Sequence, residues 1–121
     1  MSSLIEISQQ IRAFRDARDW QQFHSPKNLA CSVSIEAAEL LEKFQWCGTE
    51  ESFDVAANKK EEIRQEIADV AIYLIGLADS LEIDLLEAVS EKLHLNDAKY
   101  PAEKVRGSSK KYDEYEGGSL E

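Results

Sequence analysis

The sequence is poor in residues and segments that define several protein classes. Its 121 residues include only two cysteines, Cys31 and Cys47, which form neither a disulfide framework nor a Cys-based metal motif. We therefore expect a reducing, cytoplasmic location. The sequence also lacks an apolar run long enough to cross a bilayer and a signal-peptide pattern at its start. From these absences we expect no membrane partner.

Positive charge is also scarce. The chain has 14 Lys and Arg against 24 Asp and Glu, which gives a formal net charge of −10. A surface of this charge repels phosphate backbones and anionic lipids, so nucleic acid is not an expected partner. A small phosphorylated ligand remains compatible with the charge if it binds together with a metal cation.

Apolar residues recur at helical spacing in four segments, and no segment shows the alternation of a strand. We expect helices over residues 4–18, 26–46, 58–81 and 84–100, with a polar break and a short turn before residue 58. The expected N-cap residues are Ser3, Ser25, Asn58 and Asp84. The pattern predicts an all-α protein, an antiparallel four-helix bundle over residues 1–105, followed by a basic, flexible tail over residues 106–121.

Two of the expected helices carry acids at the border of their apolar faces. At 100° per residue, Glu36 and Glu66 lie at the edge of the apolar stripe, and Glu39 and Asp69 lie about 60° further out. An ionised carboxylate beside apolar side chains is costly unless a positive charge compensates it. Antiparallel pairing around the connection between the two helices would bring all four acids to one height. An oxygen-only ligand set predicts Mg²⁺, with Mn²⁺ as a substitute.

Several other features of the sequence are compatible with two interpretations. Acids spaced three apart occur elsewhere in the chain, so solvated helix faces are the alternative to a metal site. Trp20 and Trp46 are candidates for either a core or a base-stacking site, and His24 for either a surface or a ligand-binding role. Lys92 and Asn96 lie on the last helix, where Asn96 occupies a position at which the stripe predicts an apolar residue.

Several stretches, taken together, resemble one protein family. The stretches are Phe14–His24, Ile35–Glu39, Phe44–Trp46, Glu66–Leu74 and Lys99–Pro101. They resemble the MazG-like all-α nucleotide pyrophosphohydrolases, and within them the dCTP pyrophosphatase branch, over roughly residues 4–112. The family pattern is Glu-Glu-x-x-Glu followed by Glu-x-x-Asp. Here Ile35 replaces the first acid and the other four are present.

The resemblance implies a role for each candidate residue. The metal-binding and catalytic set would be Glu36, Glu39, Glu66 and Asp69. The base and sugar pocket would be lined by Trp20, His24, Trp46 and Tyr73. Lys92 and Asn96 would face the phosphates. Ile11 stands where some relatives carry a His.

The resemblance also implies an activity. The reaction is Mg²⁺-dependent cleavage of a (deoxy)nucleoside triphosphate between the α and β phosphates, giving the monophosphate and pyrophosphate. Substrates would be dCTP-like or non-standard nucleotides, in nucleotide-pool housekeeping, and the functional unit a homo-oligomer, a tetramer built from dimers. The alternative is a non-catalytic acidic helical module that senses nucleotides or docks a partner protein.

Overall fold

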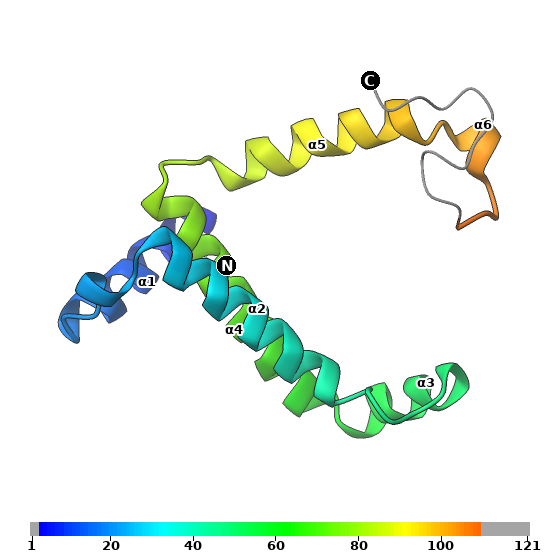
Figure 1. Cartoon of the computed structure of the whole chain (residues 1–121), viewed down its shortest axis with the longest axis horizontal. Coiled ribbons are helices and arrows are strands. Elements are labelled where there is room, and N and C mark those ends of the chain that lie inside the picture. Colours follow the sequence, from blue (N-terminus) through cyan, green and yellow to red (C-terminus); the bar gives the residue numbers. More distant parts are fainter. Residues whose placement is uncertain (1–2, 110–121) are drawn as a thin grey trace. The chain divides into compact units, whose positions relative to one another are not determined.

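The computed structural model describes residues 3–109, and these are helical almost throughout (Figure 1). The elements are α1 (Leu4–Ala17), the 3₁₀ helix η1 (Gln21–Phe23), α2 (Pro26–Glu42), α3 (Thr49–Asn58), α4 (Lys60–Ser80), α5 (Leu85–Lys99) and α6 (Ala102–Val105). No strand occurs within residues 3–109, so the all-α prediction is confirmed. Residues 110–121, most of the predicted tail, lie outside the described part.

The chain divides into two compact units. The first is Met1–Ile83, which contains α1 to α4, and the second is Asp84–Glu121, which contains α5 and α6. The predicted domain boundary at residue 105 stays a prediction.

Three helices begin at the N-caps that the sequence predicts. The side-chain oxygens of Ser3, Ser25 and Asp84 each accept a hydrogen bond from a backbone N–H three residues further on. The donors are Glu6 at 3.1 Å, Asn28 at 3.1 Å and Glu87 at 3.0 Å. Each bond satisfies one of the N–H groups that have no partner inside the first turn.

The segment between α2 and α4 differs from the prediction. Helix α2 ends at Glu42 instead of Trp46, and Thr49–Asn58 forms a ten-residue helix, α3, instead of a short turn. The prediction of Asn58 as an N-cap is wrong, because this residue ends α3 and its backbone keeps helical geometry. Lys59 occupies the cap position of α4 and makes no side-chain capping bond.

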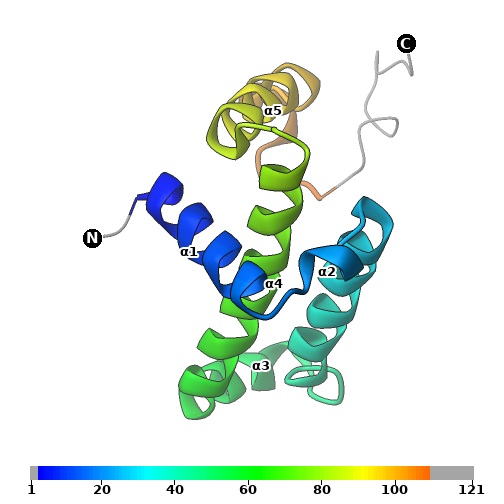
Figure 2. The same ribbon diagram turned by 90° about the vertical axis from the view of Figure 1, so that its left-hand side faces the viewer.

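Helices α2 and α4 make the most extensive helix contact and run in opposite directions, as predicted (Figure 2). Leu29 of α2 is 3% exposed, and Ile63 and Ala78 of α4 are 9% and 8% exposed. Helix α1 packs on α4, and Arg12 Nε of α1 lies 2.9 Å from Asp79 Oδ2 of α4. The first unit therefore has α4 at its centre.

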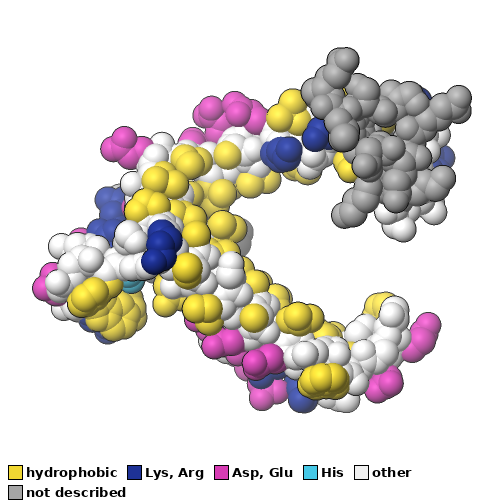
Figure 3. Space-filling view, viewed as in Figure 1, with side chains coloured by type: hydrophobic (Ala, Val, Ile, Leu, Met, Phe, Trp, Pro, Cys, Tyr) yellow, Lys and Arg dark blue, Asp and Glu magenta, His cyan; other side chains and the backbone are white. Residues whose placement is uncertain are grey.

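The apolar stripe predicted for α4 is only partly buried. Ile67, Leu74 and Leu81 are 53%, 43% and 47% exposed, because α1 and α2 cover only part of this wide stripe. On α5, Leu86 and Leu93 are also exposed. Figure 3 shows apolar side chains at the surface of the helices. Among residues 3–109, no helix is long and apolar enough to cross a bilayer.

Candidate functional site

Three of the predicted metal ligands come together where α2 and α4 pair. Glu36 and Glu39, one turn apart on α2, and Glu66 on α4 each offer a carboxylate oxygen, and these oxygens all lie within 4.8 Å of one another. We call these three residues the acid cluster. The i, i+3 spacing places the two acids of α2 on neighbouring turns, and the antiparallel pairing brings Glu66 opposite them.

None of the ion pairs found within residues 3–109 involves the acid cluster. Glu36 Oε2 and Glu66 Oε2 are buried and have no hydrogen-bond partner within the described residues. The pKa of Glu36 is raised from 4.5 to about 7, chiefly by its hydrogen bond with Glu39, then by burial, and then by the negative charges of Glu39, Asp69 and Glu66. Buried carboxylate oxygens without a partner are what a hard divalent cation would coordinate, so the cluster fits Mg²⁺ or Mn²⁺.

Asp69, the fourth predicted ligand, lies between the acid cluster and a pocket. It follows Glu66 by one turn of α4, and its charge contributes to the raised pKa of Glu36. Asp69 also lines a pocket of about 250 Å³ in the first unit. A ligand in this pocket would therefore be near the acids at one end.

Helices α1, α2 and α4 and the connection at residues 18–25 form the walls of this pocket. The lining residues that the sequence singled out are Ile11, Trp20, His24, Asp69 and Tyr73. The Phe14 and Trp20 rings meet edge to face, with centroids 5.7 Å apart, and the His24 ring lies 6.5 Å from Trp20. Such contacts restrict the orientation of Trp20. One wall of the pocket is therefore a set of packed aromatic rings.

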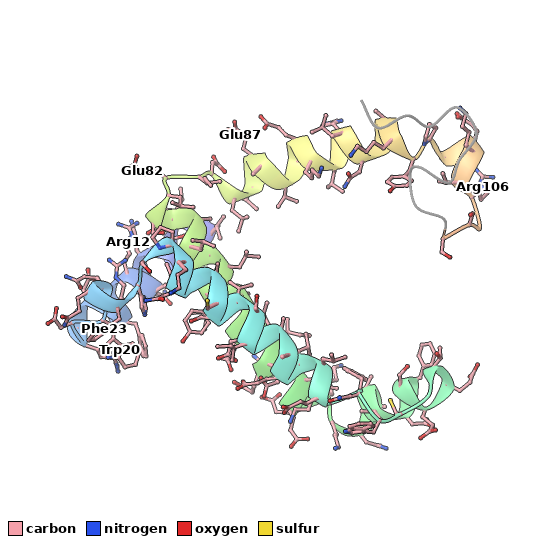
Figure 4. All side chains as sticks on the ribbon, in the orientation of Figure 1. Arg12, Trp20, Phe23, Glu82, Glu87 and Arg106 are labelled. Carbon is pink, nitrogen blue, oxygen red and sulfur yellow. The ribbon has the colours of Figure 1, made fainter. Side chains whose placement is uncertain are left out.

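The connection after α1 folds back toward the helices because of a local turn. Asp19 has a φ of 53°, a left-handed conformation that Asp tolerates better than most residues. The Trp20 N–H donates to Arg15 O at 3.1 Å, and Gln22 Nε2 donates to Asp19 Oδ2 at 3.0 Å. Trp20 and Phe23 extend from this connection in Figure 4. This turn brings Trp20 into the wall of the pocket.

Three predicted binding residues are not part of this pocket. Trp46 follows the end of α2, is 89% exposed and does not line the pocket in the described chain. Its alternative interpretation as a core residue of the single chain is therefore wrong. Lys92 and Asn96 lie on α5 in the second unit, the first exposed and the second half-buried. Their roles stay predictions.

Sequence reasoning missed several residues of the pocket. Arg12, Arg15, Gly76 and Asp79 line it, but none of them was singled out. The signal was present on α4, because Asp69, Tyr73, Gly76 and Asp79 follow one another at spacings of four, three and three residues. Such spacings keep residues on one helix face. Extending the helix face of Asp69 along α4 would therefore have identified Gly76 and Asp79 as candidate pocket residues.

The fold and the site together define a class, an all-α protein with a carboxylate cluster between antiparallel helices, suited to a hard divalent cation. The model of the MazG-like family matches residues 31–115, and the chain belongs to this family.

Named relatives agree with this family assignment. dCTP pyrophosphatase 1 of Rattus norvegicus is 40% identical and that of Homo sapiens 39% identical, each over 109 residues. The alignments cover 88% of this chain, which spans only 64% of the length of these relatives. A crystal structure of a pyrophosphatase from Archaeoglobus fulgidus is 49% identical, with a TM-score of 0.80, and the match covers 84% of this chain and 94% of that one. The resemblance to the dCTP pyrophosphatase branch is therefore confirmed.

Proposed function

We propose that this protein is a Mg²⁺-dependent nucleotide pyrophosphohydrolase. It cleaves a (deoxy)nucleoside triphosphate between the α and β phosphates and releases the monophosphate and pyrophosphate. The observation that carries the proposal is the pair of buried, partnerless oxygens of Glu36 and Glu66 beside a pocket lined by aromatic rings.

The names of the relatives support the same reaction class. Two are dCTP pyrophosphatases, and the similar crystal structure is described as a pyrophosphatase. We therefore propose dCTP-like or non-standard deoxynucleotides as substrates and nucleotide-pool housekeeping in the cytoplasm as the role. Mn²⁺ is proposed as a substitute metal, because it accepts the same oxygen ligands.

The four acids would have two roles, metal binding and activation of the attacking water. The proposed metal ligands are Glu36, Glu39, Glu66 and Asp69. Bound Mg²⁺ would neutralise charge on the transferring phosphorus and on the pyrophosphate that leaves. Glu36 or Glu39 would orient the attacking water in line with the bond to be broken and accept its proton.

The pocket would hold the base and the sugar. Its volume of about 250 Å³ lies below the range of roughly 300–1,000 Å³ that is usual for sites enclosing a whole ligand. The phosphates would extend past Asp69 toward the acid cluster, because Asp69 lines the pocket and its charge acts on Glu36 of the cluster. Trp20 offers a π face to the base, and His24 and Tyr73 offer hydrogen bonds. Lys92 and Asn96 are proposed to face the phosphates.

The functional unit that we propose is a homo-oligomer, a tetramer built from dimers. The exposed apolar side chains of Ile67, Leu74 and Leu81 support association, because burying them would remove apolar area from water. Trp46, exposed in the single chain, would then contribute to the pocket of a neighbouring copy.

The test is a panel of nucleoside triphosphates incubated with Mg²⁺ in ¹⁸O-labelled water. We expect pyrophosphate as the product and the label on the monophosphate, and we expect EDTA to stop the reaction. Release of inorganic phosphate, or full activity in EDTA, would contradict the proposal. Tight nucleotide binding without turnover would instead support the nucleotide-sensing alternative.

A further inference from the structure

The ion pair between Arg12 and Asp79 lies in the wall of the pocket. Arg12 Nε of α1 is 2.9 Å from Asp79 Oδ2 of α4, and both residues line the cavity. Their side chains are 48% and 28% exposed. Of the ion pairs among the described residues, this one joins two different helices. Neither residue belongs to the acid cluster.

The pair lies at the end of the pocket away from the acids. Asp79 follows Asp69 by ten residues of α4, about 15 Å along the helix axis, with Tyr73 and Gly76 between them. If the phosphates bind at the acids, as in the proposed function on which this inference rests, the base extends toward Arg12 and Asp79. The polar edge of the base would therefore meet these two charged groups.

We propose that Arg12 and Asp79 recognise the hydrogen-bonding edge of the base and distinguish a 4-amino from a 4-oxo pyrimidine. The Asp79 carboxylate only accepts hydrogen bonds, and the Arg12 guanidinium only donates them. Cytosine offers the complementary edge, because its 4-amino group donates to Asp79 and its O2 carbonyl accepts from Arg12. Uracil and thymine present a carbonyl oxygen at position 4, which places two acceptors against each other at Asp79.

Gly76 makes room for a flat ring at this end of the pocket. A Cβ added at Gly76 would meet Ile11 Cγ2 at 3.7 Å, an ordinary contact. The packing of α1 on α4 therefore does not require a glycine here, although glycine weakens a helix. Without a side chain at this position, the backbone of α4 lies open to the base between Tyr73 and Asp79.

A purely structural role for the pair makes a different prediction. A half-exposed ion pair adds little stability, and removing either partner breaks the same contact. Asp79→Asn and Arg12→Gln would then change the melting temperature alike and leave base preference unchanged. In our proposal the two variants differ in their kinetics, because each one removes a contact to a different atom of the base.

The experiment measures kcat and KM for dCTP and dUTP with Mg²⁺. We expect the wild-type protein to prefer dCTP at least tenfold in kcat/KM. Asp79→Asn should reduce this preference at least tenfold, mainly through KM, because an amide can turn either its oxygen or its NH₂ group toward the base. Arg12→Gln should weaken the binding of dCTP and dUTP to a similar extent, because both bases carry the O2 carbonyl. The control, Glu61→Gln, breaks an exposed ion pair with Arg64 and should change neither kcat nor KM for the two substrates.

The outcomes separate this inference from the proposed function. Two results would overturn the inference and leave the proposed function intact, provided that pyrophosphate is released. One is a wild-type protein with equal kcat/KM for dCTP and dUTP, and the other is an Asp79→Asn variant that keeps the wild-type ratio of these two values. If the wild-type protein releases no pyrophosphate from any nucleotide, the proposed function fails. Binding of dCMP and dUMP, followed by Trp fluorescence, then decides the inference: a dCMP preference lost in Asp79→Asn supports it, and equal wild-type binding overturns it.

Discussion

Glu36 of α2 and Glu66 of α4 each have a buried carboxylate oxygen, Oε2, for which the described chain provides no hydrogen-bond partner. These two acids come from helices that follow one another in the chain with α3 between them, and they share the acid cluster with Glu39. Such an arrangement destabilises the metal-free chain, because like charges face one another away from water. Binding of a divalent cation, as proposed here, would offset this cost.

Glu66→Gln tests whether the acids hold the metal. The substitution keeps the shape of the side chain but removes its charge, so we expect the affinity for Mn²⁺ to fall. Electron paramagnetic resonance measures this affinity, because the signal of free Mn²⁺ is lost on binding. Turnover should fall by roughly a hundredfold or more. Helix content should persist in circular dichroism. The control is Glu62→Gln, which removes an exposed acid of the same helix outside the cluster. Equal Mn²⁺ binding by the two variants would contradict the metal site.

The raised pKa of Glu36 predicts how stability depends on pH in EDTA. This pKa is about 7 in the folded chain, against 4.5 for an unperturbed Glu. Between these values the folded state binds the extra proton, so this residue lowers the free energy of unfolding as pH rises from 4.5 to 7.

Glu36→Gln isolates that contribution, because Gln does not titrate. The melting temperature of Glu36→Gln minus that of the wild-type protein should be smallest near pH 4.5, grow up to about pH 7 and then level off. Saturating Mg²⁺ should close or reverse the difference above pH 7 by stabilising the wild-type protein. A difference that does not vary with pH in EDTA would show that Glu36 titrates normally.

Trp46→Ala tests whether a neighbouring copy completes the pocket. Stacking on an aromatic ring contributes roughly 1–3 kcal/mol, so we expect KM to rise by about ten- to a hundredfold with a smaller change in kcat. Trp46 is 89% exposed, so the fold of the single chain should be unaffected.

A mixing experiment shows which chain supplies Trp46. Chains carrying Trp46→Ala are dissociated and reassembled with inactive chains carrying Glu66→Gln. If Trp46 acts across the interface, some sites receive a wild-type Trp46 from the Glu66→Gln chain and the low KM reappears in part of the activity. If Trp46 acts within its own chain, KM stays high. A monomer in sedimentation that still turns over substrate would contradict the shared pocket.

Gly76→Ala should have opposite effects on stability and binding. Alanine favours the helix over glycine by about 0.5–1 kcal/mol, and the added methyl group has space beside Ile11, so the melting temperature should rise. The same methyl group narrows the pocket, so KM should rise while kcat changes little. An increase in melting temperature without any change in KM would place the base elsewhere.

Local information in the sequence determined the helices and the paired acids. The periodicity of apolar residues identified four helical segments, and Ser3, Ser25 and Asp84 marked helix starts because a capping bond involves residues only three positions apart. The i, i+3 spacing likewise placed Glu36 with Glu39 on one face. The capping signature at Asn58 did not mark the start of α4, because Asn58 belongs to the preceding helix α3.

Only the tertiary structure decided what surrounds the acids. Helical periodicity fixes which side chains share a face, but not how far one helix is rotated or shifted against the next. The meeting of Arg12 with Asp79 and the partial exposure of the α4 stripe depend on these offsets. The path of the connection after α1 depends on the left-handed conformation of Asp19. An Asp tolerates this conformation but does not require it, so the residue type alone does not predict the turn. Trp20 therefore joins Tyr73 in one pocket through packing and a turn that no local pattern specifies.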